Sequence, residues 1–440
     1  MSRHRYHRII RYYVRWSILS SLIGVLCGTA SAVFLFVLER TTLLREHHPT
    51  LLYLLPVGGL IVGGLYHFFG RSVEGGNNLI IDEFHNSKSV IPIRMAPLVL
   101  LGTVFTHLFG GSAGREGTAV QMGGSIADQF THFIKANVEQ RRTLLMAGMS
   151  GGFGSVFGVP FAGMIFGMEV LNVGNLHIWS FVECGISAFV AHYVTLAWGI
   201  HHTQYFSPTV PVMTYMGTLV AIVVGIVCGG AARLFAFLTE GVAKVTKSIV
   251  KLLPIRAFIG GVVISLLFFL FPMLTRYTGL GVPIIEESIK GQVPIYDWFG
   301  KIAFTALTLG SGFKGGEVTP LLFIGSTLGN ALGQFLPLNV PLLGAMGFVA
   351  VFSGAANTPF ACTVMAMEIF GSGVWSYAAL ACFASYLVSG HHGIYHAQKV
   401  SVPKDYYISR TKEFGEFVLN RIITHTHHEQ EREKENDQEK

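Results

Sequence analysis

The sequence predicts an all-α protein that crosses a membrane several times. Only 13% of its 440 residues are charged, whereas about 25% is usual for soluble domains. Several runs without a charged residue are long enough to cross a hydrocarbon core, which takes roughly 17–25 residues. These runs lack the alternation of polar and apolar residues that a transmembrane β-barrel requires, so helices are expected.

The charge-free runs place the expected spans in order along the chain. Single crossings are expected at 16–38, 143–168 and 257–275. Two longer runs, 184–232 and 318–367, each have room for two crossings or for several broken helices. The first run is longer than the apolar part of a signal peptide and lacks a following cleavage site, so we expect it to be retained.

Positive charge gathers at both ends of the apolar region. Five arginines lie within residues 3–15, before the first run, and further basic residues follow position 398. By the positive-inside rule, both ends are expected in the cytoplasm, with an even number of crossings. Nucleic-acid binding is the alternative for a basic terminus, but these arginines adjoin a span. The expected division is a basic segment at 1–16, a membrane domain at 17–400 and a charged tail at 401–440.

The membrane domain contains an internal repeat. Residues 159–170 resemble residues 358–369 at an offset of 199, and residues 114–118 resemble residues 315–319 at an offset of 201. Two matches in the same order predict a duplication, with halves at roughly 17–205 and 206–400. The letters alone do not show whether the copies are parallel or inverted.

Two acidic residues lie in glycine-rich strings between apolar runs, Glu116 in GSAGREGT and Glu317 in GGEVTP. A carboxylate inside a membrane domain is costly to bury, so both residues are expected to be functional. The strings at 75–78, 111–117 and 315–320 are each placed to begin a short helix. Free N–H groups and the positive end of a helix dipole bind an anion without a full charge that would trap it. Glycines that merely allow close helix packing are the alternative.

The position of Glu116 predicts that anion movement is coupled to proton movement. A carboxylate that occupies an anion site competes with the anion, and it loses its charge and leaves when it is protonated. Each exchange of carboxylate for anion therefore moves a proton. The structural alternative is that Glu116 pairs with Arg115 or caps the start of a helix.

These motifs, together with PFAGMIFGME at 160–169 and the late Tyr395, resemble the CLC family of anion channels and proton-coupled antiporters. The resemblance extends over about residues 15–400. It implies two inverted repeats of tilted, broken helices whose N-termini point at a site near the middle of the membrane. It also implies a homodimer with a separate pathway in each subunit.

Departures from the chloride-type pattern resemble the fluoride-exporting bacterial clade, CLC-F. Asn77 takes the place of the serine in Gly-Ser-Gly-Ile-Pro, and Thr118 replaces the last proline of Gly-Arg-Glu-Gly-Pro. Glu317 is typical of that clade. Val170 lies where chloride antiporters carry an internal proton-relay glutamate, so Glu317 is expected to serve proton movement instead.

The resemblance therefore implies a secondary antiporter that exports fluoride in exchange for protons and confers fluoride resistance, in the plasma membrane of a bacterium. Glu116 and Glu317 are the expected gating and proton-coupling residues. Asn77 would offer an amide donor to fluoride and Tyr395 a hydroxyl donor. The expected partners are fluoride, protons, the bilayer and a second subunit, with no cofactor, metal or nucleic acid. The expected anion-binding residues are Gly76, Asn77, Arg115, Gly117, Thr118, Val318, Thr319 and Tyr395.

Alternatives remain open at this stage. A chloride/proton antiporter or a passive anion channel would have the same fold, although Asn77, Thr118 and Val170 argue against chloride. Taken alone, Asn77 is equally suited to cap a helix, and Tyr395 to lie at the membrane interface. An alternative from another class is an intramembrane metalloenzyme with ligands from His391, His392, His396 and Glu368. No glutamate follows these histidines in the His-Glu-x-x-His arrangement.

Overall fold

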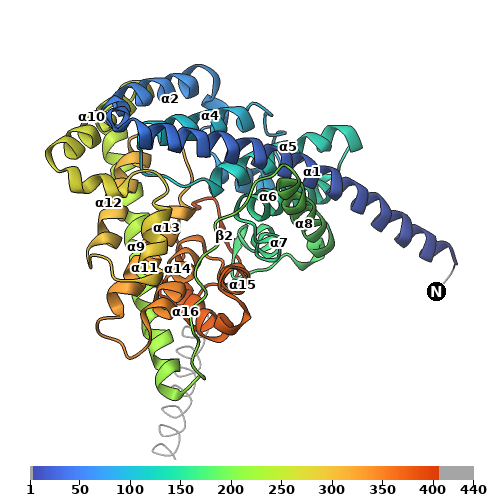
Figure 1. Cartoon of the computed structure of the whole chain (residues 1–440). Coiled ribbons are helices and arrows are strands. Elements are labelled where there is room, and N and C mark those ends of the chain that lie inside the picture. The colour runs from blue at the N-terminus through green and yellow to red at the C-terminus, as the bar shows by residue number, and fades with distance from the viewer. Residues whose placement is uncertain (1–2, 406–440) are drawn as a thin grey trace, which may run out of the picture.

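Helices of very different lengths make up the fold of this computed structural model, in which residues 3–405 are described (Figure 1). The charged tail expected at 401–440 thus lies almost wholly outside the described residues. The α-helices are α1 (Arg3–His47), α2 (Leu55–Phe69), α3 (Asn77–Asn86), α4 (Met95–Leu108), α5 (Glu116–Ile134), α6 (Val138–Phe157), α7 (Pro160–Glu169), α8 (Phe181–Ala197), α9 (Tyr215–Ile249), α10 (Leu253–Leu270), α11 (Val282–Lys290), α12 (Asp297–Gly310), α13 (Val318–Leu332), α14 (Val340–Ala356), α15 (Pro359–Phe370) and α16 (Trp375–Val388). Two short strands, β1 (Asn172–Val173) and β2 (Lys399–Val400), pair in parallel.

Helix length separates membrane spans from shorter helices that end within the protein. Among the described residues, five helical stretches are long and apolar enough to cross a membrane, and α1 and α9 are the longest. The run at 143–168 is not the single crossing that the sequence suggested. It breaks after α6, where Gly158 has a φ of 78° and Pro160 begins α7. A left-handed glycine ends a helix and a proline favours the first position of the next one, so the break follows from local chemistry.

The two halves of the chain repeat the same helix order and are inverted relative to each other. The first half consists of α1–α8 and the second half of α9–α16, and the two halves pack against each other (Figure 1). The corresponding helices α2 and α10, for example, are in contact. Between the halves, Gly114 and Gly316 form an antiparallel bridge with N···O distances of 2.6 and 2.7 Å. Because corresponding residues exchange both hydrogen bonds in an antiparallel pair, a local two-fold axis passes between them. This symmetry confirms the expectation of two inverted repeats.

Reciprocal helix caps show the same two-fold relation. Glu169, at the end of α7, accepts hydrogen bonds from the N–H groups of Phe360 and Ala361 at 3.0 and 2.8 Å. Its counterpart Glu368, near the end of α15, accepts from the first N–H groups of α7 at 2.9 and 2.7 Å. Each half thus caps a helix of the other with a carboxylate, which suits the positive end of the helix dipole.

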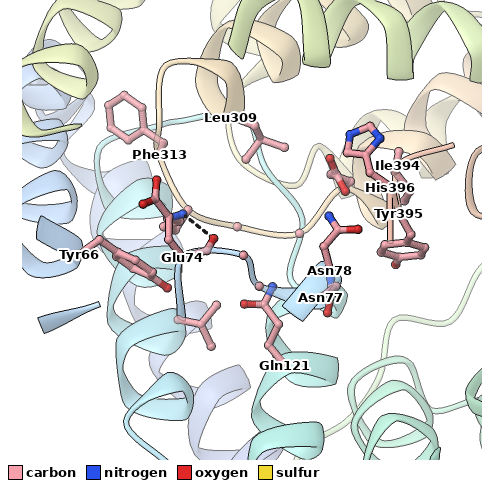
Figure 2. Close-up of a pocket in the computed structure, with 17 residues that line it drawn as sticks. Tyr66, Glu74, Asn77, Asn78, Gln121, Leu309, Phe313, Ile394, Tyr395 and His396 are labelled. Carbon is pink, nitrogen blue, oxygen red and sulfur yellow. Dashed lines mark hydrogen bonds between the residues drawn. The ribbon is translucent and has the colours of Figure 1, made fainter. Parts of the chain in front are cut away.

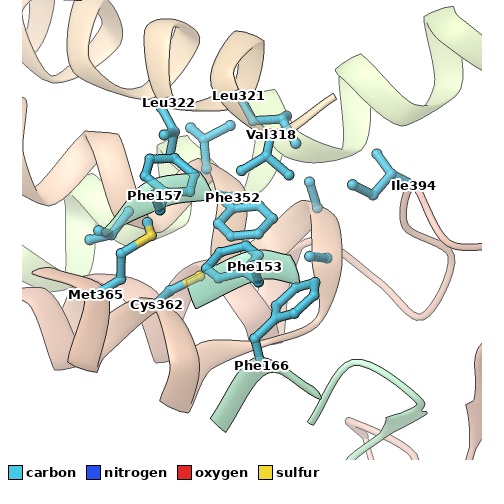
Figure 3. Packing of buried hydrophobic residues seen from close by; sticks show 14 of the residues in the cluster. Phe153, Phe157, Phe166, Val318, Leu321, Leu322, Phe352, Cys362, Met365 and Ile394 are labelled. Carbon is cyan, nitrogen blue, oxygen red and sulfur yellow. The ribbon is translucent and has the colours of Figure 1, made fainter. Parts of the chain in front are cut away.

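Apolar packing also joins the two halves (Figure 3). The rings of Phe153 in α6 and Phe166 in α7 stack with centroids 4.2 Å apart. Phe352 in α14 faces Phe153 at 6.1 Å with an interplanar angle of 10°. All three side chains are buried. This stacked core fixes the position of the helices that begin or end near the centre of the protein.

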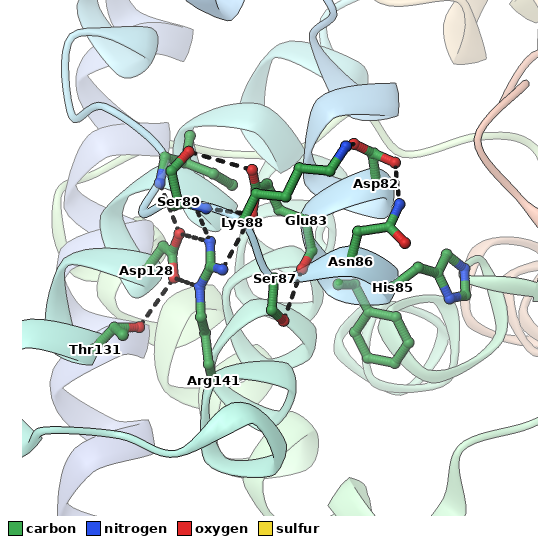
Figure 4. Close-up of polar contacts among 12 residues, drawn as sticks. Asp82, Glu83, His85, Asn86, Ser87, Lys88, Ser89, Asp128, Thr131 and Arg141 are labelled. Atoms are coloured by element: carbon green, nitrogen blue, oxygen red, sulfur yellow. Dashed lines mark hydrogen bonds and ion pairs between the residues drawn. The ribbon is translucent and has the colours of Figure 1, made fainter.

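A buried ion-pair cluster fixes α3 against α5 and α6 (Figure 4). Arg141 of α6 lies 2.7 Å from Asp128 of α5 and 3.1 Å from Glu83 of α3. It also donates to the carbonyl of Ser89 at 2.6 Å. Removing one partner of such a cluster leaves an uncompensated buried charge, so these contacts hold the three helices in one arrangement. Helices α3 and α5 each begin at the candidate site.

Candidate functional site

Three helices begin next to one another at the centre of the protein. Helix α3 begins at Asn77, α5 at Glu116 and α13 at Val318, as the glycine-rich strings predicted. Gly117 shows how closely these ends meet. A Cβ atom at Gly117 would lie 3.1 Å from the Asn77 Nδ2 atom and 3.1 Å from the Gly316 Cα atom. The helix N-termini therefore face a shared space with little room for side chains.

Glu116 is buried. Its Oε2 atom accepts a hydrogen bond from the backbone N–H of Thr319 at 3.0 Å. The Thr319 hydroxyl lies 2.7 and 2.6 Å from the two carboxylate oxygens. The Arg115 Nε atom is 3.4 Å from Oε1. The carboxylate thus lies at the N-terminus of α13, in the position that a bound anion would take.

The structure corrects the sequence match between the two acids. The sequence offset of 201 placed Glu116 opposite Glu317, but the Gly114–Gly316 bridge sets the offset at 202. Glu116 is the first residue of α5, whereas Glu317 precedes α13. By position, Glu317 is therefore the counterpart of Arg115. The two acids lie at different positions and face different surroundings.

Arg115 lines a cavity of about 370 Å³, here called the Arg115 cavity. The C-terminal half of α1, the 199–203 loop and the start of α11 supply its other walls. These contributions include Glu39, His201 and His202. The guanidinium is partly exposed to this cavity, with 17% of the side-chain surface accessible. Arg115 therefore adds positive potential to the space adjoining Glu116.

A second cavity, of about 200 Å³, lies at the start of α3 and is here called the Asn77 cavity (Figure 2). Asn77, Tyr395 and Glu317 line it together with Gly76. Gly76 has a φ of 57°, and a Cβ atom there would lie 3.2 Å from the Gln121 amide, so glycine suits this position. The structure thus brings four of the expected residues to one cavity.

Several polar atoms around the Asn77 cavity lack a partner among the described residues. The Asn77 Oδ1 atom is buried without a hydrogen bond. No described residue forms a hydrogen bond or ion pair with the Glu317 carboxylate or the Tyr395 hydroxyl. Buried polar groups usually have partners, so these atoms are available to a ligand or to water.

The remaining expected residues have different surroundings. The Thr118 hydroxyl lies 2.7 Å from the Thr103 hydroxyl of α4, with which it forms a hydrogen bond. Val318 is buried as the first residue of α13. Thr319 donates to Glu116 as described above. The anion-binding roles of these residues stay predictions.

Sequence reasoning assigned no role to several residues that line the Asn77 cavity, among them Glu74, Asn78, Gln121 and Lys314. The Asn78 side chain accepts a hydrogen bond from the N–H of Ala397 at 3.0 Å, which holds the segment carrying Tyr395 against α3. Gln121 follows Glu116 by more than a turn of helix and lies in no motif. Lys314 adjoins the Glu317 string, which was the available signal for it.

The histidines considered as metal ligands have other contacts. The His391 Nε2 atom accepts from the Lys404 N–H at 2.9 Å, and Glu368 caps α7. Within residues 3–405, no group of three or more His, Cys, Asp or Glu side chains is arranged to hold a metal ion.

Comparisons with known proteins agree on one family. Residues 58–390 match the voltage gated chloride channel family, Voltage_CLC. A chloride/fluoride channel protein from Pseudomonas syringae pv. tomato is 47% identical over 418 residues, covering 92% of each chain. The solved structure of a CLC-type fluoride/proton antiporter aligns with a TM-score of 0.85 and 34% identity, over 88% of this chain and 98% of that chain. A slow cyanobacterial Cl⁻/H⁺ antiporter shares the fold, with a TM-score of 0.74 at 20% identity over 87% and 96% of the two chains.

Proposed function

This chain belongs to the CLC, or voltage gated chloride channel, family, and on that premise we propose that it exports fluoride in exchange for protons. The observation that carries the proposal is the Glu116 carboxylate at the N-terminus of α13, where it accepts from the Thr319 N–H at 3.0 Å. The structural likeness to a CLC-type fluoride/proton antiporter supports fluoride and protons as the two ions that are exchanged.

In the proposed cycle, Glu116 and fluoride use the same donors in turn. When the carboxylate is ionised, the Thr319 N–H and hydroxyl bind it. Protonation removes its charge, which weakens these charge-assisted hydrogen bonds and releases the side chain. Fluoride then binds the same donors. A second proton-coupling role is proposed for Glu317, because its carboxylate has no hydrogen-bond or ion-pair partner among the described residues and borders the Asn77 cavity.

The selectivity for fluoride is proposed to come from donors around the Asn77 cavity. Fluoride is small and strongly hydrated, so the site must replace its water with close hydrogen-bond donors. The Asn77 amide and the Tyr395 hydroxyl are such donors, and both line the cavity. A polar donor set of this kind favours the more strongly hydrated halide.

We propose an orientation in the membrane from the order of the first helices and the positive-inside rule. Helix α1 ends beside the Arg115 cavity, and the chain turns into α2, whose far end carries Tyr66 of the Asn77 cavity. The two cavities thus lie toward opposite faces. With the basic N-terminal segment in the cytoplasm of a bacterium, the Asn77 cavity faces the cytoplasm. By analogy with the family, we propose a homodimer with one pathway in each subunit.

The test is ion flux from liposomes that contain the purified protein. A fluoride gradient is imposed while external fluoride and pH are recorded together, and the experiment is repeated with chloride. The proposal predicts proton movement opposite to fluoride and much slower exchange with chloride. Fluoride flux without proton movement would instead identify a passive channel, and faster chloride exchange a chloride antiporter.

A further inference from the structure

Tyr395 reaches the Asn77 cavity from a segment without regular secondary structure (Figure 2). Residues 389–398, between α16 and β2, form neither a helix nor a strand. The N–H of the neighbouring Ile394 donates to the Ala355 carbonyl near the end of α14 at 2.9 Å. Because no helical ladder fixes this segment, the position of Tyr395 depends on the contacts that the segment makes with its surroundings.

Gln398 joins this segment to both halves of the protein. Its Nε2 atom donates to the Val170 carbonyl at 2.7 Å and to the Ala356 carbonyl at 2.9 Å. Val170 follows α7 in the first half, and Ala356 ends α14 in the second half. Carbonyls at the end of a helix lack partners within that helix, so the Gln398 amide supplies hydrogen bonds that both helix ends need.

The oxygen of the Gln398 amide is bonded as well. Its Oε1 atom accepts a hydrogen bond from the Asn357 Nδ2 atom at 2.9 Å. Asn357 directly follows α14 and has a φ of 59°. Both N–H groups and the oxygen of the Gln398 amide therefore have partners, which fixes the orientation of the side chain.

One turn of backbone connects this fixed amide to Tyr395. The Gln398 N–H donates to the Tyr395 carbonyl at 3.2 Å, which closes the turn. Within the turn, the Ala397 N–H donates to the side chain of Asn78, the residue that follows Asn77 in α3. The turn thus lies between the start of α3 and the helix ends that Gln398 binds. A displacement of Gln398 would therefore move the Tyr395 hydroxyl relative to Asn77.

We propose that Gln398 is a positioning residue for fluoride binding, because it ties the turn that carries Tyr395 to helix ends of both halves. This inference rests on the proposed function, since it deepens the role given to the Tyr395 hydroxyl. A hydrogen bond forms only within a narrow range of distance and angle. Fluoride is smaller than chloride and loses more when one of its donors is displaced. The contacts of Gln398 therefore contribute to the preference for fluoride.

The first experiment replaces Gln398 with methionine, which has nearly the same shape but no amide. In liposomes, we expect Gln398→Met to raise the KM for internal fluoride about fivefold, with a smaller rise for chloride. The maximal rate of exchange should stay close to that of the wild type. Gln398→Asn is a second variant should the first fail to fold. Its shorter side chain cannot reach both helix ends, so the KM for fluoride should change in the same direction.

Gln129→Met is the matched control. The Gln129 Nε2 atom also donates to two backbone carbonyls, those of Ile91 at 2.7 Å and Ser125 at 2.8 Å. Gln129 lies in the part of α5 that is remote from Glu116. This variant loses a similar pair of hydrogen bonds away from the site and should keep the wild-type KM for fluoride. A KM in Gln398→Met equal to that of Gln129→Met would overturn the proposal, as would a lower maximal rate at an unchanged KM.

A double variant tests whether Gln398 acts through Tyr395. Tyr395→Phe removes the hydroxyl and should raise the KM for fluoride by itself, and Gln398→Met added to it should raise the KM no further. A full additional rise would show that Gln398 acts on another group. A wild-type KM in Tyr395→Phe would show that the hydroxyl does not contact fluoride. Both results would overturn the inference.

The outcomes for this inference and for the proposed function are distinguishable. The KM for fluoride is measured from fluoride flux alone, whereas the exchange is measured from fluoride and pH together. If the wild-type protein moves fluoride without protons, the proposed exchange fails, and the comparison of the Gln398 variants with their control still decides the role of Gln398.

Discussion

Both oxygens of the Glu116 carboxylate contact groups that would otherwise bind an anion. The Thr319 N–H and hydroxyl lie within 3.0 Å of them, and the Arg115 Nε atom lies 3.4 Å away. Burial of a carboxylate is tolerated here because a helix N-terminus and a cation offset its desolvation. The carboxylate and fluoride therefore compete for the same hydrogen-bond donors.

Selectivity is tested at Asn77. Asn77→Ser replaces a long amide donor with a short hydroxyl, so fluoride would lose a close donor, while the larger chloride ion is less dependent on it. We expect the fluoride/chloride flux ratio to fall about tenfold, which is the effect of one hydrogen bond of roughly 1.4 kcal/mol. Ion-selective electrodes on liposome efflux measure the ratio.

The control for this variant is Asn86→Ser, at the exposed end of the same helix. Asn86→Ser makes the same chemical change outside the cavity, so the fluoride/chloride flux ratio should stay as in the wild type. An Asn77→Ser ratio equal to that of Asn86→Ser would remove Asn77 from the selectivity site.

At the scale of elements, short helices that begin inside the protein supply the donors. The sequence predicted where α3, α5 and α13 begin, because glycine-rich strings before apolar runs favour helix starts near buried acids. It did not predict the break between α6 and α7, because a run without charges gives no information about its own continuity. The local indication of the break was the pair Gly158, which ends α6, and Pro160, which begins α7.

The reciprocal caps give a prediction about stability. Glu169→Gln keeps the size of the side chain but removes the charge that offsets the N-terminus of α15. We expect a loss of about 1 kcal/mol, seen as a lower Tm in detergent. Because the halves are inverted copies, Glu368→Gln, which alters the cap at the start of α7, should have a similar effect.

Glu139→Gln is the matched control, because Glu139 is 69% exposed and pairs with Arg142 on the surface. Surface ion pairs contribute little to stability, so its Tm should match the wild type. A Glu169→Gln protein as stable as this control would show that the cap does not stabilise the junction of the halves.

At the scale of the whole molecule, inversion places the two glycine-rich acids in different roles. The duplication was visible in the letters, but its inversion was not, because an antiparallel arrangement leaves no mark on sequence order. The one-residue difference between the offsets of 201 and 202 also needed the Gly114–Gly316 bridge. That difference places the Glu116 carboxylate against the N-terminus of α13 and leaves Glu317 facing the Asn77 cavity. Cavity residues outside the motifs, such as Gln121, were recognisable only from the folded chain.

The central claim is that fluoride and the ionised Glu116 carboxylate exclude each other from the N-terminus of α13. The most direct test is the fluoride affinity of the purified protein, measured by calorimetry between about pH 6 and about pH 8. Protonation removes the competing carboxylate, so affinity should rise as pH falls, by up to about tenfold per pH unit, and Glu116→Gln should bind fluoride with no such dependence. A wild-type affinity that does not change with pH, or an equal slope in Glu116→Gln, would contradict the account.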